Sequence, residues 1–205
     1  MSAFVAADVA AINSAGPVAF ETSGYINTLQ SKMTSGNVES ANEALEAFAT
    51  LCKDSSAWVE PFLLSQLPSI LDNLAVPKTA EAATHAGVAL MKKMNAHSLK
   101  IALDLLYESL ESMKWQTKVG ALVLLGSLGS LHERVVQANL PYIILRLIGM
   151  ASDVKKEVKE QTRKAFNEIC ATITNVDIIP IIPRGILFIS VSSNHNLCIT
   201  FRFTY

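Results

Sequence analysis

Apolar residues recur along most of this 205-residue chain with the spacing of an amphipathic helix. Between residues 38 and 51 they occupy every third or fourth position, and the segments 62–74 and 158–169 show similar spacing. This period places apolar side chains on one face of an α-helix, whereas a half-buried strand alternates at every second residue. Few stretches before residue 184 alternate in that way, so the pattern predicts an all-α chain. The turn signals between segments are Ser35-Gly36-Asn37, Asp54-Ser55-Ser56, Val76-Pro77-Lys78, Asn95-Ala96-His97 and Ser152-Asp153.

The predicted helices also repeat in pairs. Similar first helices contain segments that begin at residues 67, 101, 140 and 178, which are 34, 39 and 38 residues apart. Second helices begin near Ala82, Val119 and Val158, at intervals of 37 and 39 residues. A period of about 40 residues with two amphipathic helices per unit is typical of HEAT and armadillo solenoids. The third armadillo helix is missing, which favours HEAT.

We therefore expect a HEAT-like α-solenoid of about four helical pairs, because a single pair cannot bury its own apolar stripe. The predicted solenoid covers residues 18–184. Residues 1–17 precede it, either as a loosely packed segment or as a capping helix. Residues 113–128 read MKWQTKVGALVLLGSL and are apolar nearly all round after the second lysine. We expect a central second helix here, with a core face formed by Val119, Leu122, Val123 and Leu125.

Charge divides the chain, although its formal net charge is only −1. Residues 1–112 hold 6 Lys and Arg against 12 Asp and Glu, whereas residues 113–184 hold 10 against 6. The chain thus has an acidic front and a basic back.

Three further features indicate a cytoplasmic protein with no membrane partner. Cys52, Cys170 and Cys198 are far apart and odd in number, which fits a reducing compartment, and we expect the first two to be core thiols. The N-terminus has no basic region of the signal-peptide kind. No charge-free apolar span before the tail is long enough to cross a membrane.

Residues 113–183 resemble the N-terminal HEAT region of translation elongation factor 3, of the fungal, algal and oomycete type. The resemblance rests on KWQ with a following lysine and apolar run, on LPYII, on the turn DVKKEVK and on NVDIIPIIP. Residues 35–112 match in pattern and repeat length, and residues 1–34 hardly match. The general-control translational activator has a similar HEAT segment and remains an alternative.

The resemblance implies an arm that contacts the ribosome, through both rRNA and ribosomal proteins, and that works beside other translation factors. Intact family members hydrolyse ATP on two cassettes to assist the release of tRNA from the exit site. This chain contains no G-x-x-x-x-G-K-[ST] loop, so we expect it to be no enzyme and to bind no cofactor itself. ATP is implied only for intact members. A generic HEAT adaptor for an acidic protein partner is the alternative function.

The strongest candidate contact is a basic stripe formed by Lys155, Lys156, Lys159, Arg163 and Lys164. On a helix, residues 155, 159 and 163 share one face, and residues 156 and 164 lie beside it. Such a stripe could contact rRNA phosphates and release their counterions. The alternative is a solvated face, with Glu157 and Glu160 partly offsetting the charge.

A second candidate contact consists of Lys114, Trp115 and Lys118. We favour packing of Trp115 between two repeats with solvated lysines. The alternative is an exposed indole that stacks on a base or anchors a protein. The four histidines have no partner at helical spacing, so we expect no metal site, and no carboxylate pair indicates catalysis.

Residues 185–205 differ from the rest of the chain. From Gly185 to Phe201 there is no Asp, Glu, Lys or Arg, and β-branched and aromatic residues dominate without a helical period. We expect an irregular or β-prone tail that does not match the family. Our hypothesis is that it is not a native fold element and reflects a truncated gene model, a retained intron or a frameshift. A natural hairpin that closes the solenoid is the alternative.

Overall fold

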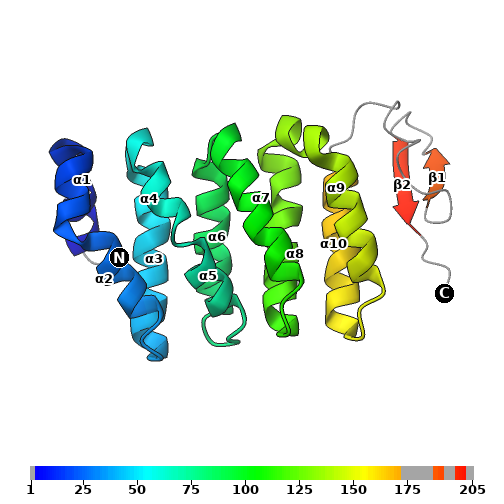
Figure 1. The fold of residues 1–205 in the computed structure, drawn as a ribbon, viewed down its shortest axis with the longest axis horizontal. Helices are drawn as coiled ribbons and strands as arrows, with labels where there is room; N and C mark the ends of the chain where they lie inside the picture. Colours follow the sequence, from blue (N-terminus) through cyan, green and yellow to red (C-terminus); the bar gives the residue numbers. More distant parts are fainter. Residues whose placement is uncertain (1–2, 172–186, 192–196, 202–205) are drawn as a thin grey trace. The chain divides into compact units, whose positions relative to one another are not determined.

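The computed structural model describes residues 3–171, 187–191 and 197–201, and the first helix expected around residues 178–182 lies outside them. Within these ranges the chain forms ten α-helices, one 3-10 helix and two strands (Figure 1). They belong to two compact units, residues 1–105 and 106–205. In chain order the elements are α1 (Ala3–Ser23), α2 (Tyr25–Met33), α3 (Val38–Asp54), η1 (Ala57–Val59), α4 (Glu60–Leu64), α5 (Leu67–Leu74), α6 (Ala80–Lys93), α7 (Ala96–Leu110), α8 (Trp115–Leu131), α9 (Glu133–Ala151), α10 (Lys156–Ala171), β1 (Leu187–Val191) and β2 (Leu197–Phe201).

Short polar side chains begin several helices at the turns that the sequence predicts. The side chain of Asn37 accepts hydrogen bonds from the N–H groups of Glu39 and Ser40 at the start of α3. Asn95 accepts two backbone hydrogen bonds in the same way at the start of α7. These oxygens satisfy donors that the first turn of a helix leaves unpaired. The predicted helical period and its turns are therefore confirmed in this part of the chain.

The segment 62–74, expected as one continuous helix, is broken between α4 and α5. The break falls two residues before Pro68. Proline has no backbone N–H, and its ring clashes with the carbonyl group four residues earlier, so α4 ends at Leu64. Near the start of α5 the same proline is well tolerated. The apolar face survives the break, with buried members Leu63, Leu67, Ile70, Leu71 and Leu74.

In unit 1, α3 packs along α6, and α2 and α5 each pack on one of these two helices. Helix α1 also packs on α3 and is kinked at Gly16, where φ is +82°. Val9 and Ile12 are buried before the kink, and Phe20 is buried after it. The ring of Phe20 meets those of Trp58 and Phe62 edge-on, with centroids 5.7 and 5.4 Å apart. Residues 3–17 are thus helical, and α1 continues to Ser23, beyond the expected boundary at residue 17. The expected division of the chain at that residue stays a prediction.

In unit 2, α8 packs along α10 and α9 packs against both. Leu122 and Leu125 are fully buried in α8, as expected. Val119 and Val123 are only half-buried, so their assignment to the core face is wrong. The buried residues of α8 include three glycines, and two of them, Gly126 and Gly129, face α10.

Two of these glycines bring α8 unusually close to α10. A Cβ atom on Gly129 would lie 3.0 Å from the carbonyl oxygen of Glu168 and 3.2 Å from Cα of Ile169. One on Gly126 would lie 3.1 Å from Cα of Ala165. Only a residue without a side chain fits against backbone at that distance, so GSLGS at residues 126–130 is a helix-packing surface.

Long-range side-chain hydrogen bonds in the described residues join positions one repeat apart. In unit 1 they link Asn13 to the Asp54 carbonyl and Ser56 N–H, Asn73 to the Met33 carbonyl, and Glu60 to Asn95. In unit 2 they link Lys118 to Asp153 and Arg146 to Glu111. These bonds span 35 to 43 residues. The separation agrees with the predicted period of about 40 residues.

The tail contains the two described strands, which pair antiparallel with Ile189 opposite Ile199. Strand β2 lies against α10. Strand formation agrees with the β-prone composition of residues 185–205. The side chains of both strands lie outside the described residues, so the hypothesis that the tail is not a native fold element stays a prediction.

The close approach of α8 and α10 generates a stability prediction. We expect Gly129→Ala to lower the free energy of unfolding by about 1–2 kcal/mol, because the new methyl group meets backbone atoms that cannot swing away. Gly149→Ala is the matched control: it lies in α9 with nothing within 4 Å of its Cβ position. The control should leave stability unchanged or raise it by up to about 1 kcal/mol. Urea denaturation measures both, and an equal effect at the two positions would contradict the assignment.

Candidate functional site

The basic stripe lies on α10 and on the turn before it. Lys156, Arg163 and Lys164 are exposed on the helix, and Lys155 is exposed one residue before it begins. Lys159 is half-buried and interacts within the chain. The opposite face of α10 is buried, as expected, through Val158, Thr162, Ala165, Phe166 and Ile169.

The charge of this stripe is only weakly offset by its own helix. Lys156 Nζ lies 3.5 Å from Glu160 Oε1, and their side chains are 85% and 59% exposed. An exposed pair of this kind contributes at most about 1 kcal/mol and is screened by salt. Lys156, Arg163 and Lys164 therefore remain accessible to an anionic partner.

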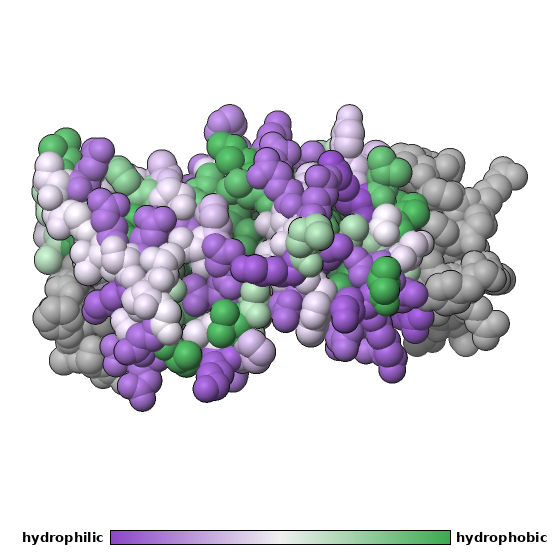
Figure 2. All heavy atoms as spheres, turned by 60° about the horizontal axis from the view of Figure 1, so that its bottom comes forward, coloured by the Kyte–Doolittle hydropathy of each residue, from purple (hydrophilic) through white to green (hydrophobic). Residues whose placement is uncertain are grey.

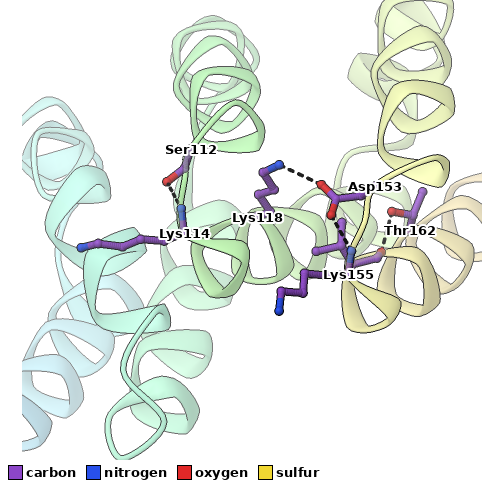
Figure 3. A network of polar contacts seen from close by, with 7 residues as sticks. Ser112, Lys114, Lys118, Asp153, Lys155 and Thr162 are labelled. Atoms are coloured by element: carbon purple, nitrogen blue, oxygen red, sulfur yellow. Dashed lines mark hydrogen bonds and ion pairs between the residues drawn. The ribbon is translucent and has the colours of Figure 1, made fainter.

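The second candidate group does not act as one site. Lys118 Nζ lies 2.8 Å from Asp153 Oδ2, and the two side chains are only 20% and 12% exposed. Lys114 is exposed and immediately precedes α8, while Trp115 is half-buried at the first position of the helix. Figure 3 shows the Lys118 ammonium directed at Asp153, whereas those of Lys114 and Lys155 point away from it. The structure thus separates a paired lysine from two accessible ones.

Asp153 is a structural residue that the sequence indicated only as part of a turn. Its Oδ1 atom also accepts a hydrogen bond of 2.9 Å from the backbone N–H of Lys155, just before α10. The hydrogen bond from Lys118, helped by that from Lys155, holds the pKa of the Asp153 carboxyl below its ordinary value. The carboxylate therefore joins the first turn of α8 to the turn before α10. The sequence signal that could have indicated this contact is the separation of 35 residues between Lys118 and Asp153, which is close to one repeat.

A second cation of unit 2 is paired at the surface, where the side chains of Arg146 and Glu111 are 46% and 66% exposed. Arg146 Nη1 lies 2.5 Å from Glu111 Oε1. Its guanidinium carbon lies 5.6 Å from the centroid of the Tyr107 ring, within cation–π range. Sequence reasoning missed this contact, whose partners are again 35 residues apart.

Other site chemistry is sparse in the described part of the chain. No group of three His, Cys, Asp or Glu residues there could hold a metal ion. Cys52 and Cys170 are buried as expected, and burial raises the pKa of each thiol to about 12. No helix in those residues combines the length and apolar character needed to cross a membrane.

The Lys118–Asp153 pair generates a pH-dependent prediction. A carboxyl pKa lowered by folding contributes stability above its unfolded value of about 3.9, and this is lost as the pH falls through the folded value. We expect Asp153→Asn to lower the free energy of unfolding by about 1–2 kcal/mol near neutral pH. The difference from the unsubstituted chain should shrink below about pH 4, as measured by urea denaturation across pH. Asp104→Asn, at an exposed position, is the control, and a pH-independent loss would contradict the role of the charge.

Comparison with known proteins identifies the family. Residues 3–166 match the family model described as EF3 N-terminal HEAT repeat. Elongation factor 3 of Gonapodya prolifera is 35% identical over 144 residues, which cover 68% of this chain and 13% of that protein. The human protein named stalled ribosome sensor GCN1 is 31% identical over 145 residues, which cover 68% of this chain and 5% of that protein. The chain thus spans only a small part of either relative.

A solved structure shows the same fold at low sequence identity. The structure was determined to study tubulin recruitment by microtubule polymerases with TOG domain arrays. Its sequence is 14% identical to this chain, and the two structures superpose with a TM-score of 0.61. The match covers 78% of this chain and 34% of that one. With the paired helices above, it supports the predicted all-α, HEAT-like class.

The family match also corrects one expectation. It begins at residue 3, so the inference that residues 1–34 hardly resemble the family is wrong. The alanine-rich sequence of α1 has too weak an amphipathic contrast for its helical period to stand out. Because the match covers most of the sequence, the chain belongs to the EF3 N-terminal HEAT repeat family.

Proposed function

We propose that this chain is a ribosome-contacting HEAT module of a translation factor, and that the exposed face of α10 contacts rRNA phosphates. The names of its relatives, elongation factor 3 and stalled ribosome sensor GCN1, support a role at the ribosome. In an intact protein of the elongation-factor-3 type, the module would serve as a binding arm beside ATP-hydrolysing cassettes. Those cassettes would drive the release of tRNA from the exit site.

The observation that carries the proposal is that the stretch about one repeat length before the cations of α10 contains no acidic residue. Long-range polar contacts here join positions 35 to 43 residues apart. Positions at that distance before Lys156, Arg163 and Lys164 fall within residues 112–132, which contain no Asp or Glu. At that separation these three side chains therefore have no preceding acidic partner of the kind that Arg146 has in Glu111.

The geometry of the face suits a phosphate backbone. Lys156, Arg163 and Lys164 lie within about 100° of one another around the helix axis. A guanidinium group binds phosphate through two parallel hydrogen bonds, while the ammonium groups act as point charges. Contacts of this kind fix position on a nucleic acid without reading its sequence. We therefore expect recognition of rRNA shape and charge rather than of bases.

Similarity to the GCN1 proteins supports a second candidate. The chain matches them at identities close to those for elongation factor 3, so a module of the general-control activator type is the alternative assignment. A basic face would also attract an acidic protein, as in a generic HEAT adaptor. Capture that persists after RNase treatment and without ribosomes would favour such an adaptor.

Sedimentation with purified ribosomes over a range of salt concentrations tests the proposal. We expect the triple variant Lys156→Gln, Arg163→Gln and Lys164→Gln to bind at least about tenfold more weakly. The slope of log affinity against log salt should also fall by about one for each phosphate that the variant no longer neutralises.

The matched control removes three exposed lysines of unit 1 through Lys53→Gln, Lys92→Gln and Lys100→Gln. It loses the same charge, so it should bind like the unsubstituted chain if α10 is the contact. Equal weakening by both triple variants would show that net charge alone attracts the chain. Unchanged binding of the α10 variant would exclude the face as the contact.

A further inference from the structure

Two turns of unit 2 expose an apolar side chain immediately before an accessible lysine. Met113, in the turn between α7 and α8, is 100% exposed, and Val154, in the turn between α9 and α10, is 94% exposed. Lys114 and Lys155 follow them and are exposed as well. Both turns lie at the lower end of the helices in Figure 1. Figure 2, which brings that end forward, shows apolar side chains set singly among hydrophilic ones.

Folding does not account for the exposure of Met113 and Val154, which are called the apolar tips below. A single exposed apolar residue is ordinary, but Met113 and Val154 bury almost nothing and occur at equivalent turns of consecutive repeats. Neither residue forms part of the buried face of α8 or of α10. Their exposure leaves both available to a partner.

Polar contacts of the fold hold the two tips in a defined arrangement (Figure 3). Lys118, in the first turns of α8, bonds Asp153, the residue before Val154. The Lys114 N–H donates to Ser112 Oγ at 3.2 Å, which orders the turn that carries Met113. Helices that pack together lie roughly 10 Å apart, so we expect a similar separation between the tips. A surface held in place before binding loses less conformational freedom when it binds.

The positive charge of this surface favours an acidic partner. The carboxylate of Asp153 is already bonded to Lys118, whereas the side chains of Lys114 and Lys155 have no acidic partner in the described residues. The tips therefore combine two apolar groups with two positive charges. Phosphates of RNA would satisfy the lysines but would leave Met113 and Val154 in water, since bases stack mainly on aromatic side chains.

We propose that Met113, Lys114, Val154 and Lys155 form a docking site for an extended acidic segment of a partner protein. A segment in the extended polyproline II conformation advances about 3.1 Å per residue and has three residues per turn, so apolar anchors three positions apart would face the same way and reach both tips. Acidic residues between and beside the anchors would face Lys114 and Lys155. This site goes beyond the proposed rRNA contact, because it uses other residues and another class of partner.

Fluorescence anisotropy with the full chain tests the site. The first probe is a synthetic peptide with leucines three positions apart among aspartates and glutamates, a spacing that places them on one face of a polyproline II helix. The second has serines in place of the leucines, and the third is a single-stranded oligouridine. We expect the first peptide to bind at least about tenfold more tightly than the second.

Substitutions of nearly equal size locate the binding. The double variant Met113→Gln and Val154→Thr keeps volume and removes apolar surface, so it should lower affinity for the first peptide about fivefold to tenfold. Met113→Leu should retain that affinity. Leu145→Asn is the control, since Leu145 is 67% exposed on α9, away from both turns in sequence. It should leave binding unchanged.

Several results would overturn the proposal. One is a failure of the first peptide to bind, and another is an equal affinity for the first peptide and the serine peptide. A third is that the double variant binds the first peptide as tightly as the unsubstituted chain, while Leu145→Asn binds it more weakly. Tighter binding of oligouridine than of the first peptide, abolished by Lys114→Gln with Lys155→Gln, would assign the turns to RNA instead. No ribosome is present and the α10 face is intact, so these outcomes are independent of the sedimentation test.

Discussion

Each helical pair of this chain can bury its apolar face only against the next pair, and the polar contacts obey the same constraint. Apolar burial is non-directional, so by itself it allows one helix to slide along another. Hydrogen bonds between defined atoms remove that freedom. The buried carboxylate of Glu60 accepts bonds of 2.8 and 3.0 Å from the backbone and side chain of Asn95, one repeat later. Such contacts fix the register of neighbouring repeats within each unit.

Helices α8 and α10 show how steric and electrostatic contacts combine at one such interface. Gly126 and Gly129 let the two helices approach closely along their length, while Asp153 bonds Lys118 near the start of α8. Shape complementarity and a charge-assisted hydrogen bond thus act at different points of the same contact. Contacts within the fold thus account for Lys118, which the sequence offered as a candidate contact, and for the glycines of GSLGS.

The sequence predicts the features that depend on one helix and misses those that depend on its neighbour. Periodicity and turn residues located most helices, because amphipathic spacing and the caps at Asn37 and Asn95 are local. The break before Pro68 is also local, but the continuous apolar stripe concealed it. By contrast, Lys118 and Lys155 look alike in the sequence, but the Asp153 carboxylate pairs with the side chain of Lys118 and leaves that of Lys155 accessible. Nor does an apolar residue in a turn, such as Met113, reveal how exposed it will be.

In a repeat of this kind, the side chains available to bind a partner are those that do not pair with a neighbouring repeat. Lys118 and Arg146 are each paired with a carboxylate 35 residues away. For the cations of α10, the corresponding stretch, residues 112–132, is free of acidic residues. If all the basic residues of 113–184 were paired with acidic residues of the same chain, their charge would contribute only to the stability of the fold. Because residues 112–132 offer no acid, the surplus on α10 remains at the surface, where long-range attraction to an anionic partner is its main physical consequence.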